Sequence, residues 1–183
     1  MRYCPDCGQP TERRIPAGDV HERDVCGSCG AIHYENPRVV VGCVPEWEGR
    51  VLLCRRAIEP RKGYWTAPAG FLEIGESLHA AAARETTEEA LASVEVGSLL
   101  SVVNVLGAAQ VHVMFRARML SATHGAGEES LETALLREED IPWPDIAFRS
   151  VRFALEHYFA DRRAGHDRLH FQDLDPVDAR RGR

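Results

Sequence analysis

Three glutamates in an alanine- and glutamate-rich segment are placed so that they could bind a divalent cation together. These are Glu85, Glu88 and Glu89. Residues 77–91 are predicted to be helical with Ser77 as the N-cap, and in a helix the spacings i, i+3 and i+4 put three side chains on one face. Like charges there repel by roughly 0.2–0.5 kcal/mol per pair, so the cluster does not serve helix stability. Carboxylate oxygens suit Mg²⁺ or Mn²⁺, although the pattern alone also fits a solvated acidic face in which Arg84 pairs with Glu88.

Four of the six cysteines stand in two Cys-x-x-Cys pairs, a spacing typical of a zinc site. The ligands would be Cys4, Cys7, Cys26 and Cys29. A glycine follows each pair and permits the tight turn that points backbone amides at sulfur. Because all four positions would be taken by protein, a Zn²⁺ ion here would be structural; an iron–sulfur site and a redox pair are the alternatives. The other two cysteines, Cys43 and Cys54, lie in apolar stretches and are expected to be buried.

The elements that must position these groups divide the chain into three parts. Residues 1–34 are rich in turn formers, so a metal would substitute for the core they lack. Residues 35–160 carry the periodic apolar segments of a globular domain, and residues 161–183 are expected to form a polar tail that is frayed or docked on a partner. These assignments rest on the printed sequence alone.

Strands and helices in the middle part follow from apolar periodicity. Strands are predicted over residues 38–44, 51–55, 64–67, 94–105 and 111–120, with a hairpin loop at residues 45–50. Residues 131–136 fit a strand or a helix equally well. A second amphipathic helix is predicted from the helical spacing of Val151, Leu155, Tyr158 and Phe159. This order predicts an α+β fold, with a mixed sheet covered by helices.

The composition limits the class of protein. The 183 residues are 44% hydrophobic, enough to bury a core, and their net charge of −6 argues against a DNA-binding protein. No apolar run approaches the roughly 18 residues of a membrane span, and the N-terminus lacks the apolar core of a signal peptide. A cytoplasmic protein without a membrane partner is therefore expected.

Residues 70–92 resemble the Nudix box, which is glycine, five residues, glutamate, seven residues, then Arg-Glu-apolar-x-Glu-Glu-x-Gly-apolar. The matching positions are Gly70, Glu76, Arg84, Glu85, Glu88 and Glu89. Two positions depart from it: Thr86 replaces an aliphatic residue, and Leu91 replaces the glycine that normally ends the helix in a left-handed conformation. The cysteine pairs and the run RRAIEPRKGYWTAPAGFLEIGES are similar to the zinc-ribbon branch of Nudix hydrolases. The resemblance implies an α/β/α sandwich around a mixed sheet, preceded by a zinc ribbon over residues 1–34.

The same resemblance implies metal-dependent hydrolysis of the pyrophosphate bond of a nucleoside diphosphate derivative. By family position, Glu85, Glu88 and Glu89 would bind Mg²⁺ or Mn²⁺, with the Gly70 carbonyl as a further ligand. Arg84 would orient the carboxylates, and Glu76 would stabilise the loop before the helix. Some relatives take the general base from a glutamate on a downstream loop; here Glu129 is favoured, and the alternatives are Glu128 and Glu132.

Substrate contacts are expected near the loop before the box. Arg56 and Arg61, with their neighbours Arg55 and Lys62, could contact phosphate, although solvated surface charge fits equally well. Phe71 is the favoured aromatic contact; the other candidates for stacking, which more often belong to a core, are Tyr64, Trp65 and Trp143. The eight histidines show no metal-ligand spacing and are assigned no role.

The choice of substrate rests on a sequence marker. The NADH-pyrophosphatase group carries Ser-Gln-Pro-Trp-Pro-Phe-Pro after the box, and this chain does not. The stretch SLLSVVNVLGAAQVHVMF after the box instead resembles the plant FAD/ADP-ribose pyrophosphatase group and its bacterial relatives, so the resemblance implies ADP-ribose or FAD ahead of NADH. The enzyme is expected to be a homodimer like its relatives. Two other classes stay open: a regulator that binds an ADP-ribose-type ligand, and an RNA-binding or decapping protein. The intact carboxylates favour the enzyme, and acidic residues around the cysteines disfavour contacts with a phosphate backbone.

Overall fold

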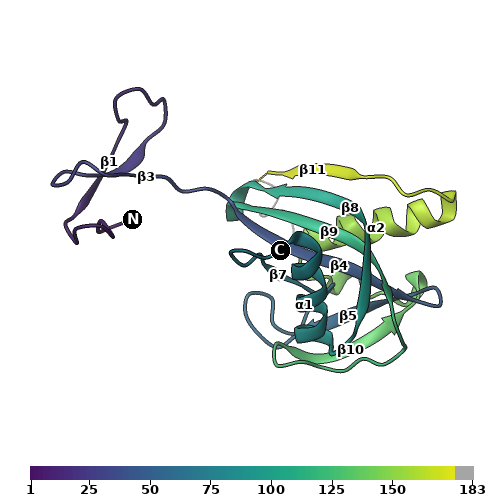
Figure 1. Ribbon diagram of the computed structural model, residues 1–183. Helices are drawn as coiled ribbons and strands as arrows, with labels where there is room; N and C mark the ends of the chain where they lie inside the picture. The colour runs from purple at the N-terminus through teal and green to yellow at the C-terminus, as the bar shows by residue number, and fades with distance from the viewer. Residues whose placement is uncertain (176–183) are drawn as a thin grey trace. The chain divides into compact units, whose positions relative to one another are not determined.

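The computed structural model describes residues 1–175, which fall into two compact units. The first is Met1–Asn36, and the second begins at Pro37. Each unit has its own β-sheet (Figure 1). The boundary expected from the sequence lies after residue 34.

The first unit is a small antiparallel sheet with very little apolar core. Its strands are β1 (Thr11–Arg14), β2 (Arg23–Cys26) and β3 (Ile32–His33), in the order β1-β2-β3. Within residues 1–36 the buried apolar side chains are Cys4, Pro16, Val25 and Cys26. Burial of so few side chains cannot offset the entropy of ordering such a segment, so the fold needs a further source of stability.

The second unit is built on a mixed sheet, as predicted. Its strands, in the order β10-β5-β4-β9-β8-β11, are β10 (Ser130–Leu136), β5 (Arg50–Arg56), β4 (Arg38–Trp47), β9 (Gln110–Met119), β8 (Val94–Val105) and β11 (His170–Leu174). The pairs β4–β9 and β8–β11 are parallel, and the other pairs are antiparallel. Two short strands extend it: β6 (Trp65–Thr66) pairs with β5, and β7 (Ala69–Phe71) pairs with β4.

Two helices cover opposite faces of this sheet (Figure 1). Helix α1 (Leu78–Ala90) packs Ala81 and Ala82 against Val41 and its same-face neighbours, whereas α2 (Arg149–Ala164) packs against Val44 and its neighbours. Successive residues of a strand point to opposite faces of the sheet, so Val41 and Val44, three residues apart, lie on opposite faces. The apolar spacing predicted for the second helix is confirmed, since Val151, Leu155, Tyr158 and Phe159 are all buried. Among residues 1–175, neither helix has the length and apolar content that crossing a membrane requires.

The hairpin after β4 differs from the sequence expectation, and the segment that the sequence left open is now assigned. The hairpin loop expected at residues 45–50 is only a two-residue turn, because Glu48 and Gly49 both take positive φ, which suits the twist of the flanking strands. Residues 131–136, left open by the sequence, form β10 paired with β5.

Much of the expected tail forms regular structure. Helix α2 runs past residue 161 to Ala164, and β11 then pairs in parallel with β8. Buried Asp161 is the local cause: it accepts hydrogen bonds from the Arg116 guanidinium and the Arg168 backbone N–H, and it contacts His170 at 3.0 Å. The rest of the expected tail, residues 176–183, lies outside the described part of the chain.

Candidate active site

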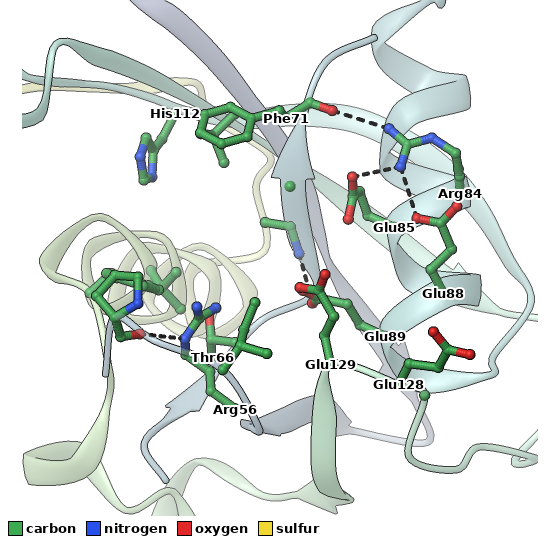
Figure 2. A pocket seen from close by; sticks show the side chains of 18 of the residues that line it. Arg56, Thr66, Phe71, Arg84, Glu85, Glu88, Glu89, His112, Glu128 and Glu129 are labelled. Carbon is green, nitrogen blue, oxygen red and sulfur yellow. Dashed lines mark hydrogen bonds and ion pairs between the residues drawn. The ribbon is translucent and has the colours of Figure 1, made fainter. Parts of the chain in front are cut away.

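A cavity of about 1120 Å³ lies in the second unit, beside α1 and the strand that precedes it. Its volume is of the size that small-molecule ligands occupy. The box residues that line it are Gly70, Arg84, Glu85, Glu88 and Glu89. Figure 2 shows the helix carboxylates on one side of this cavity, with His112 and Arg56 on the opposite side.

Helix α1 holds the predicted carboxylates at the cavity. Ser77 is its N-cap as predicted, and the Ser77 hydroxyl accepts a hydrogen bond from the Ala80 N–H at 3.2 Å. Glu85 and Glu89 are only 8% and 6% exposed, whereas Glu88 is exposed. Burial raises the pKa of Glu85, and it raises the pKa of Glu89 to about 8, because a carboxylate loses its water when it is enclosed. A bound cation would stabilise the ionised form of these two buried carboxylates.

Arg84 connects three of these carboxylates. Its guanidinium makes two hydrogen bonds of 2.9 Å to Glu76, and it donates to one oxygen of Glu85 at 2.6 Å and to one oxygen of Glu88 at 2.9 Å. It also donates to the Phe71 carbonyl at 3.2 Å. Among the described residues, the hydrogen bonds to Glu85 and Glu88 involve only one oxygen of each carboxylate. The arginine therefore ties the helix to the preceding loop without occupying both oxygens of either group.

Strand β7 brings backbone groups directly against the carboxylates. A Cβ on Gly70 would lie 2.3 Å from Glu85 Oε1, so no other residue fits there without displacing Glu85. The Ala69 N–H donates to Glu89 Oε2 at 3.2 Å. Glycine is thus required at residue 70 by close approach and not by its own backbone angles.

The two departures from the box are both accommodated. Leu91 ends α1 in the left-handed conformation, with φ of 47° and ψ of 32°, as a glycine would. Thr86 is fully buried, where its hydroxyl donates to the Ala82 carbonyl at 2.8 Å and contacts the Cys43 sulfur at 3.1 Å. Cys43 and Cys54 are buried as expected, and neither departure moves a carboxylate out of the cavity.

A loop after β9 brings Glu129 to the same cavity. The Gly125 and Gly127 N–H groups donate to the Ala90 and Glu89 carbonyls at 2.8 and 3.1 Å, and a Cβ on Gly127 would lie 1.7 Å from the Glu88 carbonyl oxygen. Burial is the main cause of the raised pKa of Glu85 and Glu89, and the charge of Glu129 adds to it, which places the three groups close together.

Of the two alternatives to Glu129, only one lies at the cavity. Glu128 lines it. Glu132 instead forms an ion pair of 2.9 Å with Arg55, and neither of these residues is among those that line the cavity.

Of the three residues favoured as substrate contacts, Arg56 and Phe71 lie at the cavity and Arg61 does not. Arg56 and Phe71 line the cavity, and the Arg56 Nε–H donates to the Pro60 carbonyl at 2.8 Å. Burial raises the pKa of Glu89, and the charge of Arg56 acts in the opposite direction, so the two groups are near each other. Arg61, in contrast, does not line the cavity. Its backbone has a φ of 66°, and its guanidinium lies 5.2 Å from the centre of the Tyr64 ring.

The other candidate contacts also lie elsewhere. Trp65 and Trp143 pack against the hydrophobic core under α2, as aromatic side chains in apolar segments commonly do, and Lys62 and Tyr64 are not among the cavity-lining residues.

Sequence reasoning missed the side of the cavity that faces the carboxylates. This side is lined by uncharged residues that include Gln110, His112 and Phe148. The only available signal was the spacing of Gln110 and His112, two polar residues at i and i+2 in an apolar strand, which puts both on one face.

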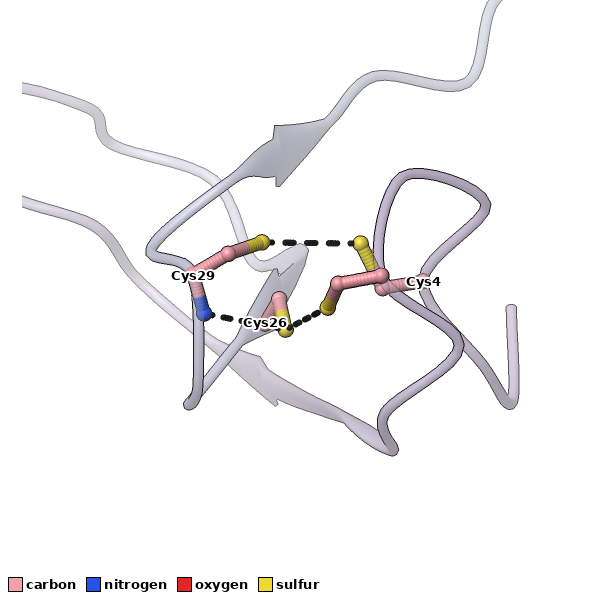
Figure 3. A group of neighbouring side chains, drawn as sticks. Cys4, Cys26 and Cys29 are labelled. Atoms are coloured by element: carbon pink, nitrogen blue, oxygen red, sulfur yellow. Dashed lines mark hydrogen bonds between the residues drawn. The ribbon is translucent and has the colours of Figure 1, made fainter.

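The four paired cysteines converge in the first unit (Figure 3). Their sulfurs all lie within 4.8 Å of one another, with Cys4–Cys29 at 3.7 Å and Cys7–Cys26 at 3.5 Å. Sulfurs bound tetrahedrally to Zn²⁺ lie about 3.8 Å apart, so this set fits the ion. A hydrogen bond from the Cys29 N–H is the main cause that lowers the pKa of Cys26 to about 6, which favours the thiolate.

The carboxylates of the cavity converge less closely than the sulfurs. Within residues 1–175, the tightly grouped sets of potential metal ligands are the four cysteines and the set Cys4, Asp6 and His33. Arg84 forms ion pairs with Glu76, Glu85 and Glu88, so these carboxylates gather around the arginine. The oxygen-only donor set still fits Mg²⁺ or Mn²⁺ by its chemistry.

The raised pKa values predict that the metal-free protein loses stability as the pH rises from about 4.5 to about 8. In this range the Glu89 carboxyl keeps its proton in the folded state and has lost it in the unfolded state. The unfolded state thus binds fewer protons, and the free energy of unfolding falls with pH, by on the order of 3 kcal/mol. Glu85 acts with the same sign.

Urea unfolding at pH 5 and pH 8 measures this loss. All three tryptophans (Trp47, Trp65 and Trp143) belong to the second unit, so their fluorescence reports on that unit. The Glu89→Gln variant is expected to lose clearly less stability between the two pH values. An equal loss in both proteins would assign the pH dependence to other groups.

Comparison with known proteins agrees with both sites. A family model described as Nudix N-terminal matches residues 2–35, and one described as NUDIX domain matches residues 36–125. A crystal structure of a NUDIX hydrolase from Nitrosomonas europaea is similar with a TM-score of 0.92 and 47% identity, covering 95% of this chain and 99% of that one.

Two curated relatives have assigned activities. The mitochondrial NAD(P)H pyrophosphatase NUDT13 of Mus musculus is 32% identical over 146 residues, which are 78% of this chain and 38% of that protein. The ADP-ribose pyrophosphatase of Methanocaldococcus jannaschii is 39% identical over 69 residues, which are 38% of this chain and 41% of that protein. The chain thus spans about two fifths of the length of both relatives. The two family matches, the fold and the intact box carboxylates agree with one another. This chain therefore belongs to the Nudix hydrolase family and carries the N-terminal zinc ribbon of one of its branches.

Proposed function

We propose that this protein hydrolyses the pyrophosphate bond of a nucleoside diphosphate derivative, with Mg²⁺ or Mn²⁺ held by Glu85, Glu88 and Glu89. The observation that carries the proposal is the pair of buried carboxylates, Glu85 and Glu89, whose pKa values are raised by burial at the wall of a ligand-sized cavity. Enclosing two anions is unfavourable unless a cation accompanies them. Strongly perturbed carboxylates in a cavity are typical of a functional site.

Each residue has a definite part in the proposed reaction. The Gly70 carbonyl would complete the ligand set beside the three glutamates, and Arg84 would fix their side chains from the far side. A bound divalent ion would offset charge on the phosphate oxygens and favour ionisation of a bound water. Arg56 would contact phosphate across the cavity, where a guanidinium can make two parallel hydrogen bonds. The zinc ion of the first unit would be structural, since four sulfurs leave it no open position.

Glu129 is the proposed general base. The Gly127 contact with α1 and the hydrogen bond from the Ala57 N–H to the Glu129 carbonyl, 2.8 Å, fix its backbone at the cavity. Glu129→Gln is expected to lower kcat by roughly a hundredfold or more, because the amide cannot accept the proton of the attacking water. The rate is measured by phosphate release from the best substrate after phosphatase treatment.

Two further variants make that result specific. Glu132→Gln is the matched control, because Glu132 lies on the same strand region but pairs with Arg55 away from the cavity, and it is expected to keep full activity. Unchanged turnover in Glu129→Gln together with a loss in Glu128→Gln would transfer the role to Glu128.

The proposed substrate is ADP-ribose or FAD, followed by NADH. The absence of the Ser-Gln-Pro-Trp-Pro-Phe-Pro marker supports this order, and so does the similarity to an ADP-ribose pyrophosphatase, while the similarity to an NAD(P)H pyrophosphatase supports NADH. Incubation with each of these compounds, NAD and dinucleoside polyphosphates in Mg²⁺ or Mn²⁺, with products identified by mass, tests the proposal. Release of nucleoside monophosphate is the expected result; binding without cleavage of any compound would contradict it.

We also propose a cytoplasmic homodimer with no role in DNA binding. The six cysteines form no disulfide bonds, which supports a reducing compartment. The net charge of −6 disfavours DNA binding, and the resemblance to dimeric relatives supports the homodimer. The mass in solution by light scattering tests the dimer, and a mobility-shift assay at modest salt tests DNA binding.

A further inference from the structure

Gln110 and His112 form a polar pair on the side of the cavity that faces the carboxylates. Both belong to β9 and are two residues apart, so their side chains share one face of the strand. Figure 2 shows the His112 ring beside Phe71, across the cavity from Glu85, Glu88 and Glu89. The proposed hydrolysis assigns no part to this pair.

The hydrogen bonds of His112 fix its tautomer. His112 Nε2 lies 2.9 Å from Gln110 Oε1, and His112 Nδ1 lies 2.8 Å from Ser150 Oγ. An amide oxygen only accepts, so Nε2 carries the hydrogen; Nδ1 therefore accepts from the Ser150 hydroxyl. Burial lowers the pKa of His112 to about 4, because the enclosed ring loses the water that would stabilise its charge. The ring is thus neutral near pH 7.

The Gln110 amide contacts this anchored ring through its Oε1 end. Ser150 is 2% exposed and His112 is 9% exposed, so the two anchors are held by the packing of α2 against the sheet. Gln110 itself is half-buried and lines the cavity. With Oε1 bound to His112, the –NH₂ end of Gln110 is the part that can meet a ligand, and it is a donor only.

The surrounding side chains suit a flat group. Most residues lining this side are uncharged, namely Val40, Thr66, Gln110, His112, Phe148 and Val151. The Arg56 guanidinium lies 5.0 Å from the centre of the Phe148 ring, and Glu59 and Glu73 also line the cavity. Phe71 adds an aromatic ring that is 44% exposed at the cavity edge. A planar ring finds stacking and apolar contacts here, and a fixed donor prefers a ring nitrogen or carbonyl oxygen.

We propose that Gln110, held by His112 and Ser150, is a specificity-determining residue that donates a hydrogen bond to an uncharged ring of the substrate. The inference rests on the proposed function in that this ring is attached to the diphosphate cleaved at the carboxylates. The ring is a nucleobase or an isoalloxazine, both of which present nitrogen or carbonyl acceptors.

The test measures whether Gln110 contributes to the affinity for a nucleobase or flavin ring. Dissociation constants are determined by calorimetry with Mg²⁺ present for three monophosphates: AMP, FMN and ribose 5-phosphate, which has neither a nucleobase nor a flavin ring. In Gln110→Leu the affinity for AMP, for FMN or for both is expected to fall about fivefold, the effect of one neutral hydrogen bond, and that for ribose 5-phosphate to change less than twofold. A fall for AMP alone identifies a base, and a fall for FMN alone identifies a flavin.

Two further variants keep the result interpretable. Gln172→Leu changes an exposed glutamine on β11 and is expected to leave all three affinities unchanged. Gln110→Glu keeps the shape of the side chain and its bond to His112 but replaces the donor with an acceptor, so the ratio of AMP to ribose 5-phosphate affinity is expected to fall further. Equal changes for ligands with and without a ring, or no change at all, would overturn the proposal.

The outcome is separable from that of the proposed function. The readout is a ratio of binding constants for compounds that contain no pyrophosphate bond, so it does not require turnover. Selective ring binding by a protein that cleaves nothing in the substrate panel would reject the hydrolysis and keep the role of Gln110.

Discussion

Replacing Glu89 with glutamine is expected to lower Mg²⁺-dependent turnover by about a thousandfold, the effect of losing roughly 4 kcal/mol of transition-state stabilisation from the metal site. Glu89 is buried, accepts a hydrogen bond from Ala69, and lies near both Glu85 and Glu129. Glutamine keeps the shape but not the charge that would hold the cation. The same result is expected for Glu85→Gln. The measurement is the initial rate of product formation over a range of Mg²⁺ concentrations.

Two controls separate a lost metal ligand from a damaged fold. Glu156→Gln changes an exposed glutamate on α2 that pairs with Arg152 at 2.8 Å, and it is expected to keep full activity. Glu89→Gln is expected to be more stable than the wild type at pH 8 without metal, since it removes a buried charge. A stable Glu89→Gln variant with wild-type turnover at every Mg²⁺ concentration would contradict the proposed ligand set.

Removing the metal of the cysteine site is expected to unfold residues 1–36 while leaving the second unit folded. Zinc binding by small domains contributes on the order of 10 kcal/mol, and this unit buries only four apolar side chains of its own. Cys26→Ser, or treatment with a strong chelator, should therefore collapse the dispersion of amide proton shifts from residues 1–36. Tryptophan fluorescence, which reports on the second unit, should stay unchanged.

Metal analysis of the purified protein completes this experiment. One zinc per chain is expected in the wild type and none in Cys26→Ser, whereas Ser28→Ala, at an exposed residue between the paired cysteines, should retain it. Iron with acid-labile sulfide would instead favour the iron–sulfur alternative. A folded first unit without any metal would contradict the structural role.

The groups that sequence reasoning placed well are those whose geometry is local. Two Cys-x-x-Cys turns bring sulfurs close within each pair, and one helix brings Glu85 and Glu89 to one face whatever surrounds it. The continuous apolar runs that become the buried centres of β4 and β5 are local in the same way. These features depend on distances of a few residues, which the sequence contains directly.

The groups that sequence reasoning placed poorly depend on contacts between distant segments. Glu129 was expected at the cavity from the family resemblance and does line it, where Gly127 docks on the end of α1, whereas Arg61 was expected there and is not among the lining residues. His112 faces Ser150 from 38 residues away. Such pairs become visible only when the sheet and α2 are assembled, because no periodicity in one strand specifies what covers it.

The parallel pairing of β11 with β8 has a consequence beyond the cavity. Residues 170–174 satisfy the backbone of residues 101–105, which would otherwise present unpaired N–H and C=O groups at an open edge. Edges of that kind recruit strands from other molecules. A chain truncated after α2 would keep every cavity-lining residue but would replace the 5-residue edge strand β11 with the 12-residue strand β8. Self-association of the longer exposed edge is therefore the expected defect of the truncated chain.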